Sequence, residues 1–139
     1  DLRELPALIN FVVKPNGDLM MFSGELSTLD DESGVLIATD VVAVSSTYAS
    51  YSGVIVVAYA VGKSVYYFTY DGETRSEPFE IFSFKENILE LSLVRNCQST
   101  SFLVVGLESG KNYLFSSVTE VMEEDKSSKI YLSMSVEFN

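Results

Sequence analysis

The sequence predicts an all-β fold made of about three copies of one unit, each centred on a β-hairpin. Two observations favour strands: apolar runs rich in Val, Ile, Tyr and Phe, and the pairing of these runs around turns that contain glycine. A third observation indicates a repeat, because the turn glycines Gly17, Gly62 and Gly110 stand roughly 45 to 48 residues apart.

The three predicted hairpins define the repeat. Residues 7–13 lead through a turn into residues 18–23, residues 54–60 lead into 64–69, and residues 102–107 lead into 112–117. Glycine suits these turns because it adopts the positive φ that tight hairpin connections require.

Further strands are predicted on both sides of the hairpins. Residues 41–47 and 88–94 each precede a hairpin, and in the second run leucine alternates with polar residues at a period of two. Residues 35–38 and 79–84 follow hairpins and are expected to be outer strands. Residues 130–138 fit either the outer strand of the third unit or the first strand of a fourth.

Four such strands in antiparallel order are typical of one blade of a β-propeller. The sequence therefore predicts a single β-repeat domain with approximate blades at residues 1–40, 41–87 and 88–139. Propellers typically have about four to eight blades. We therefore expect an incomplete propeller: part of a larger protein in the favoured interpretation, or a ring completed by further copies or by another chain.

Residues 28–50 allow a competing fold. This segment opens with Leu29 followed by three acidic residues, as a helix often does, and could continue as an amphipathic helix. The chain would then resemble an α/β roadblock- or longin-like module, a scaffold subunit of small-GTPase regulatory complexes. The many Val, Ile, Thr and Ser residues of the segment are poor helix formers and favour the all-β alternative.

Residues 41–117 resemble the blades of a family of large triple-propeller proteins. The run Val-Ile-Val-Val-Ala-Tyr-Ala-Val-Gly-Lys-Ser-Val-Tyr-Tyr-Phe at 54–68 carries the resemblance, and residues 88–93 followed by 102–107 repeat its pattern. The family includes damaged-DNA-binding protein 1, the splicing factor 3b propeller subunit and the large cleavage-and-polyadenylation subunit. The resemblance covers a little over half of the chain and implies a nuclear scaffold that docks partner proteins without catalysis.

Charge and composition narrow the expected partners. The net charge of −11 argues against direct binding of nucleic acid, whose affinity depends on Lys and Arg contacts to phosphates. The acidity instead favours other protein subunits with basic surfaces. The longest apolar run, residues 54–61, is too short for a membrane span. One cysteine and no glycosylation sequon favour an intracellular location, and the resemblance favours the nucleus over the cytoplasm.

No catalytic, cofactor or metal site is predicted. The sequence has no histidine, which removes His-dependent triads and His-based metal sites. Arg95 is the nearest basic residue to Cys97 in the sequence, which is weak support for a reactive thiolate. We therefore interpret Cys97 as an ordinary loop or half-buried cysteine. The acidic runs at 30–32 and 123–125 lack the ligand spacing of a calcium loop. Gly62-Lys63 and Gly110-Lys111 lack the earlier glycine of a P-loop.

The tyrosines supply the candidate interface residues. Tyrosine is a favoured interface anchor, and of two adjacent strand residues one faces the opposite side of the sheet from the other. The alternative is that these side chains pack between blades. The candidates are Tyr48, Tyr51, Tyr66, Tyr67 and Tyr70.

The sequence as a whole predicts a non-catalytic protein-interaction scaffold within a larger multi-subunit assembly. The alternatives are the roadblock-type subunit and a propeller that binds a ligand in its central channel.

Overall fold

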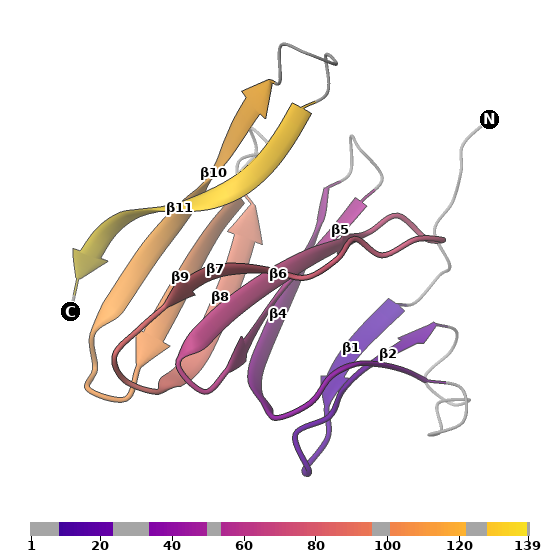
Figure 1. The fold of residues 1–139 in the computed structure, drawn as a ribbon, viewed down its shortest axis with the longest axis horizontal. Coiled ribbons are helices and arrows are strands. Elements are labelled where there is room, and N and C mark those ends of the chain that lie inside the picture. Colours follow the sequence, from indigo (N-terminus) through magenta and orange to yellow (C-terminus); the bar gives the residue numbers. More distant parts are fainter. Residues whose placement is uncertain (1–8, 24–33, 50–53, 96–100, 122–127, 139) are drawn as a thin grey trace.

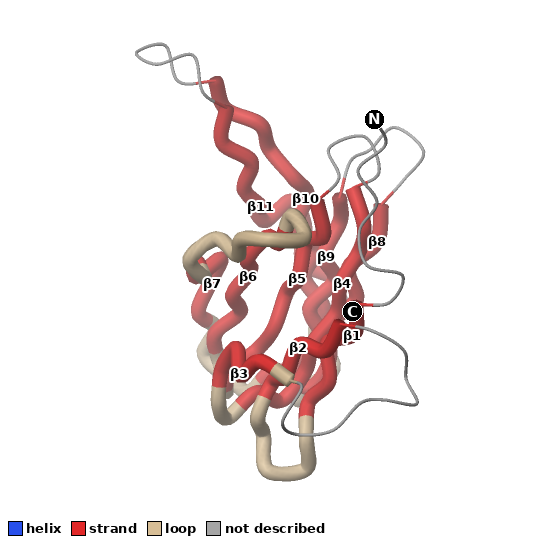
Figure 2. Tube along the Cα trace, turned by 90° about the vertical axis from the view of Figure 1, so that its right-hand side faces the viewer, coloured by secondary structure: helices blue, strands red, loops and turns tan. Residues whose placement is uncertain are grey.

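The computed structural model describes residues 9–23, 34–49, 54–95, 101–121 and 128–138. Within these ranges the chain forms eleven strands and no helix (Figures 1 and 2). The strands are β1 (Ile9–Val13), β2 (Leu19–Ser23), β3 (Val35–Ala38), β4 (Val41–Ala49), β5 (Val54–Val61), β6 (Ser64–Tyr70), β7 (Phe79–Ser83), β8 (Ile88–Arg95), β9 (Ser101–Leu107), β10 (Asn112–Val121) and β11 (Ser128–Phe138).

The strands pair into three separate sheets that follow one another along the chain. The first sheet has the order β1-β2-β3, the second β4-β5-β6-β7 and the third β8-β9-β10-β11, and every pairing is antiparallel. The all-β prediction of repeated antiparallel sheets is therefore confirmed, and the arrangement is propeller-like. Because β11 pairs with β10, the last strand is the outer strand of the third sheet rather than the start of a fourth.

The hairpin turns have the backbone that their glycines make possible. Gly17 and Gly110 have φ values of 93° and 94°, and each donates its amide back across the turn, to the carbonyls of Lys14 at 2.8 Å and Leu107 at 3.0 Å. Gly62 has a φ of 60° at the first position of a two-residue turn between β5 and β6. A type II′ turn takes glycine at that position.

The helix considered for residues 28–50 is wrong over the described part of the segment. Residues 35–38 and 41–49 form β3 and β4, while 28–33 and 50 lie outside the described ranges. β3 adds to β2, and β4 pairs with β5 along its length, so the β-branched residues of this segment lie on pleated surfaces that suit them. The hairpin–helix–strand order of a roadblock- or longin-like module is therefore not the fold.

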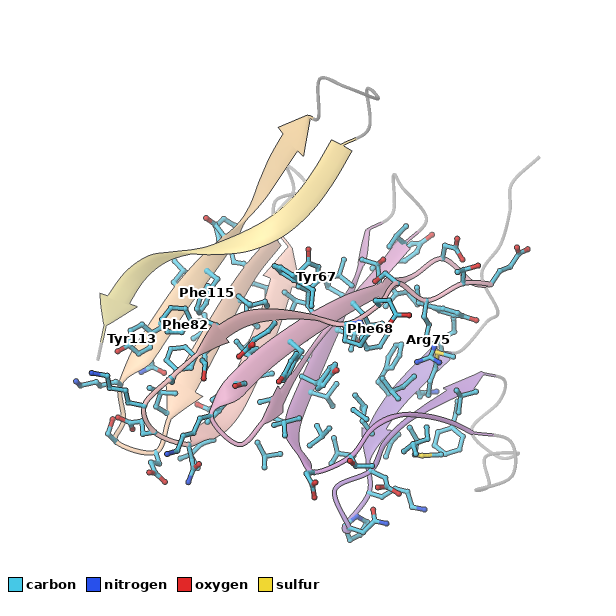
Figure 3. All side chains as sticks on the ribbon, viewed as in Figure 1. Tyr67, Phe68, Arg75, Phe82, Tyr113 and Phe115 are labelled. Carbon is cyan, nitrogen blue, oxygen red and sulfur yellow. The ribbon has the colours of Figure 1, made fainter. Side chains whose placement is uncertain are left out.

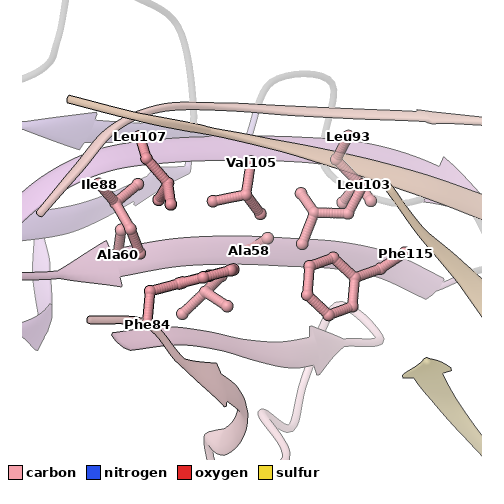
Figure 4. Packing of buried hydrophobic residues seen from close by; sticks show 10 residues of the cluster. Ala58, Ala60, Phe84, Ile88, Leu93, Leu103, Val105, Leu107 and Phe115 are labelled. Carbon is pink, nitrogen blue, oxygen red and sulfur yellow. The ribbon is translucent and has the colours of Figure 1, made fainter. Parts of the chain in front are cut away.

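Two apolar layers hold the three sheets face to face. The layer between the first and second sheets contains Leu19, Val41, Val57, Tyr59 and Phe68. The layer between the second and third sheets contains Ala58, Ala60, Val65, Phe84, Ile88, Leu93, Leu103, Val105, Leu107 and Phe115 (Figure 4).

The second sheet is therefore covered on both sides. Successive residues of β5 alternate between the two layers, Val57 toward the first sheet and Ala58 toward the third. β5 is a central strand of this sheet with both faces covered, which accounts for its uninterrupted apolar run.

The hairpin turns also connect each sheet to the next. The carbonyl of Gly17 accepts a hydrogen bond from the amide of Val41, the first residue of β4, at 2.8 Å. The carbonyl of Gly62 accepts one from the amide of Ile88, the first residue of β8, at 2.9 Å. The same contact thus fixes the start of the second sheet on the first and of the third sheet on the second.

The third sheet differs from the second at its outer edge. β10 pairs with β9 only from Asn112 to Ser116 but pairs with β11 from Asn112 to Val121. The β10–β11 hairpin therefore continues past β9 as a two-stranded ribbon, which projects from the stack in both views (Figures 1 and 2).

Candidate protein-interaction surface

The adjacent tyrosines of β6 point to opposite sides of the second sheet. Tyr66 faces the first sheet and stacks on Tyr59, with ring centroids 5.4 Å apart and an interplanar angle of 19°. Tyr67 faces the third sheet (Figure 3). Its ring meets that of Phe79 edge to face, with centroids 4.9 Å apart and an interplanar angle of 89°. Both tyrosines are half-buried and pack between the sheets of this chain.

Burial changes the acidity of two of these hydroxyls. It raises the pKa of Tyr67 above its ordinary value, and burial together with the neighbouring Tyr66 raises the pKa of Tyr59. Both groups therefore stay protonated at physiological pH and remain able to donate a hydrogen bond inside the stack.

The other three predicted tyrosines differ from one another in how far the structure leaves them accessible to a partner. Tyr48, near the end of β4, is 47% exposed and is the most accessible candidate that the structure describes. Tyr70 is half-buried, and its hydroxyl donates to the carbonyl of Gly72 at 2.9 Å, which fixes it within its own loop. Tyr51 lies outside the described residues.

The third sheet has one side that faces away from the other two sheets. The pairing register groups the residues of β8, β9 and β10 on that side into three rows: Glu90–Gly106–Asn112, Ser92–Val104–Leu114 and Val94–Phe102–Ser116. We call these nine residues the open face.

Apolar side chains fill the middle and one end of the open face. Val94 is 51% exposed, while Phe102, Val104 and Leu114 are half-buried. Leu89, the extra residue at the bulge where the β8–β9 register shifts, is 62% exposed beside this face. The open face therefore presents Val94, the adjacent Leu89 and three half-buried apolar side chains beside the exposed Glu90 and Ser92.

The matching side of the second sheet shows what such a surface does inside this chain. Its rows are Ala43–Ala60–Val65, Ser45–Ala58–Tyr67 and Thr47–Val56–Thr69, in the same register as the rows of the open face. The third sheet covers this side, so that Ala58, Ala60 and Val65 have no exposed surface. Position for position, the open face is the counterpart of a buried one.

One row of the open face is polar where its counterpart is apolar. Glu90 and Asn112 replace Ala43 and Val65, and the Glu90 side chain lies across Gly106 between them. A Cβ at Gly106 would lie 2.9 Å from Cγ of Glu90 and 3.2 Å from Oδ1 of Asn112, so glycine provides the room for this arrangement.

A hydrogen bond of the third turn also differs from those of the other two. The carbonyl of Gly110 accepts from the side-chain amide of Asn112 at 3.2 Å. The equivalent carbonyls of Gly17 and Gly62 accept instead from the first backbone amide of the following sheet. In the described chain, Asn112 thus takes the place that the next sheet occupies elsewhere.

None of the predicted tyrosines that the structure describes lies on the open face, because all four belong to the second sheet. A local sign is present at Glu90 in β8, a charged residue at the position where the equivalent strand β4 has Ala43. A charged residue at such a position favours a face that is in contact with solvent in the free protein.

We also searched the described residues for groups of side chains that could hold a metal ion. Among the described residues, no three acidic or cysteine side chains come together as a metal site would require. The acidic runs at 30–32 and 123–125, and Cys97, lie outside the described residues.

Two further findings concern membranes and relatives. In the described ranges there is no helix long and apolar enough to cross a bilayer. Neither a family model nor a curated protein matches this chain.

Proposed function

We propose that this chain is a non-catalytic protein-interaction scaffold, a propeller segment that binds other subunits within a larger intracellular assembly. The open face is the observation that carries the proposal, because it exposes apolar side chains in the register of a side that is buried one sheet earlier. Apolar patches of this kind on soluble proteins commonly mark interaction sites.

The charge of the chain supports partners with basic surfaces. Its net charge is −11, and the exposed carboxylates include Asp71, Glu73, Glu77 and Glu80 in and around the β6–β7 connection. Such a surface attracts basic partners over long range and raises their association rate. Direct binding of nucleic acid is not part of the proposal, because phosphates would be repelled.

The sequence supports a role without catalysis and a location in the nucleus. Histidine, the commonest general base at neutral pH, is absent from all 139 residues. The resemblance of residues 41–117 to nuclear triple-propeller scaffolds is the basis for placing the proposed assembly in the nucleus.

Native purification tests the proposed function. The gene is tagged at its own locus, the protein is purified gently from its own cells, and the eluate is examined by native mass spectrometry. We expect other proteins to co-purify in fixed stoichiometry. A protein that elutes as the free chain under these conditions, with no partner in stoichiometric amount, would contradict the proposal.

A further inference from the structure

We propose that the open face binds the apolar side of an antiparallel β-sheet supplied by a separate partner subunit, with a Lys or Arg of that sheet opposite Glu90. This inference rests on the proposed scaffold function and specifies the partner's chemistry. Three properties of the face carry it: its register, its hydrogen-bonding positions and its one charged row.

The register of the face specifies a sheet as the occupant. Its rows repeat those of the second-sheet side on which the third sheet packs. In its middle row Val104 and Leu114 stand at the places of Ala58 and Tyr67, so the apolar character is preserved. Sheets that pack face to face interdigitate their side chains in this way.

A hydroxyl marks where the first strand of the bound sheet would lie. On the second sheet, the Oγ of Ser45 accepts a hydrogen bond from the backbone amide of Leu93 in β8 at 2.9 Å. Ser92 is the counterpart of Ser45 in the third sheet, and it is exposed on the open face. It can accept an equivalent amide hydrogen bond from a strand packed there.

The charged row indicates a separate partner rather than a permanent neighbour in the same chain. Where this chain covers its own sheet, the row is Ala43–Ala60–Val65, with no polar side chain. The open face has Glu90 and Asn112 in that row, a mixture of polar and apolar groups typical of surfaces that are also exposed in the free protein. A buried carboxylate needs a paired charge, so the partner must supply a basic side chain.

The same charge argues against a second copy of this chain as the occupant. Each copy has a net charge of −11, so two copies repel one another. A basic partner is attracted instead, and it pairs with Glu90 on docking.

The experiment begins with the full chain in its own cells. A photo-crosslinking phenylalanine derivative replaces Phe102, and the crosslinked protein and peptide are identified by mass spectrometry. That protein is then produced and titrated with the wild-type chain, Glu90→Lys, the milder Glu90→Gln and the control Leu36→Glu, which adds charge on the first sheet at an exposed position. Circular dichroism confirms that each variant folds.

We expect the crosslink to fall on an antiparallel sheet of a different protein. Glu90→Lys should weaken binding about tenfold or more and Glu90→Gln less, while Leu36→Glu binds as the wild type does. Reversing the partner's basic side chain to Glu should restore binding to Glu90→Lys.

Several results would overturn the inference. They are a crosslink between two copies of this chain, a crosslink to another segment of its own polypeptide, no crosslink at all, and unchanged affinity in Glu90→Lys. The proposed function fails separately, if no protein co-purifies. If proteins co-purify equally well with wild type and Glu90→Lys, the scaffold stands and only this inference is wrong.

Discussion

Gly17→Ala and Gly110→Ala form a matched pair that tests the contact between a hairpin turn and the following sheet. The two glycines have nearly the same φ, 93° and 94°, so alanine meets the same backbone strain in both turns. That strain costs about 1–2 kcal/mol, offset by roughly 0.4–1 kcal/mol because alanine restricts the unfolded chain. Gly110→Ala, whose new Cβ meets nothing within 4 Å, should therefore lose about 1 kcal/mol of unfolding free energy.

The surroundings of Gly17 add a second cost. Its new Cβ would lie 3.2 Å from Cα and 3.4 Å from N of Asp40, a residue that itself has a φ of 59°. If Asp40 shifts, the 2.8 Å hydrogen bond from Val41 to the Gly17 carbonyl weakens, and such a bond contributes about 1 kcal/mol. Gly17→Ala should therefore destabilise the chain by about 2 kcal/mol, roughly twice as much as Gly110→Ala.

Urea unfolding followed by tyrosine fluorescence and by far-ultraviolet circular dichroism measures the difference, since the chain has no tryptophan. Equal losses for the two variants would refute the reasoning, because they would show that the first turn does not press on the start of the second sheet.

Three further predictions follow from the same structure. The Phe115 side chain is 1% exposed and lies between the second and third sheets. Phe115→Ala removes its ring and leaves a cavity, so it should lower the free energy of unfolding measured in urea by about 3–5 kcal/mol. Ser45→Ala should cost about 1 kcal/mol or more because it removes the acceptor for an amide of β8, whereas Ser92→Ala on the open face should cost less than about 0.5 kcal/mol. Equal costs would contradict the claim that a packed sheet engages Ser45 and leaves Ser92 exposed in the free chain. Hydrogen bonds from Ser109 hold the pKa of Glu86 below its ordinary value, so its stabilising contribution is full above the unfolded-state pKa and is lost as pH falls through the folded-state pKa. Glu86→Gln should make the free energy of unfolding fall less steeply as pH is lowered into the acid range. An unchanged fall would contradict the role given to the hydrogen bonds between Ser109 and Glu86.

The strands could be predicted from sequence because their signals are local. The glycine turns and the apolar runs on either side of them determine the hairpins without reference to distant residues. The described part of the 28–50 segment, residues 35–49, is harder to predict, since the acidic residues at 30–32 and the apolar spacing that follows them also fit a helix. Pairing with β2 and β5, which are separate in sequence, decides in favour of strands there.

The interaction surface could be predicted only in part, because a tyrosine's chemistry does not reveal which side of a sheet is covered. Tyr66 and Tyr67 are equally suited to anchor a partner protein, yet both pack inside this chain. The first sheet covers Tyr66 and the third sheet covers Tyr67. The open face depends on the stacking order of the three sheets, and that order is a tertiary property. Glu90 is its local sign, but the charge becomes informative only beside Ala43 at the same position of β4.

Thiol labelling at positions 45 and 92 tests whether the sheets stack in chain order and whether a partner covers the open face. Ser45→Cys and Ser92→Cys are each made in a Cys97→Ser background, which removes the one native thiol. Maleimide reaction rates are then measured in the free chain and in the assembly purified from its own cells. We expect a slow reaction at position 45 in both states, and a fast reaction at position 92 that becomes slow in the assembly. Equal rates at the two positions in the free chain, or a position 92 that stays fast in the assembly, would contradict it.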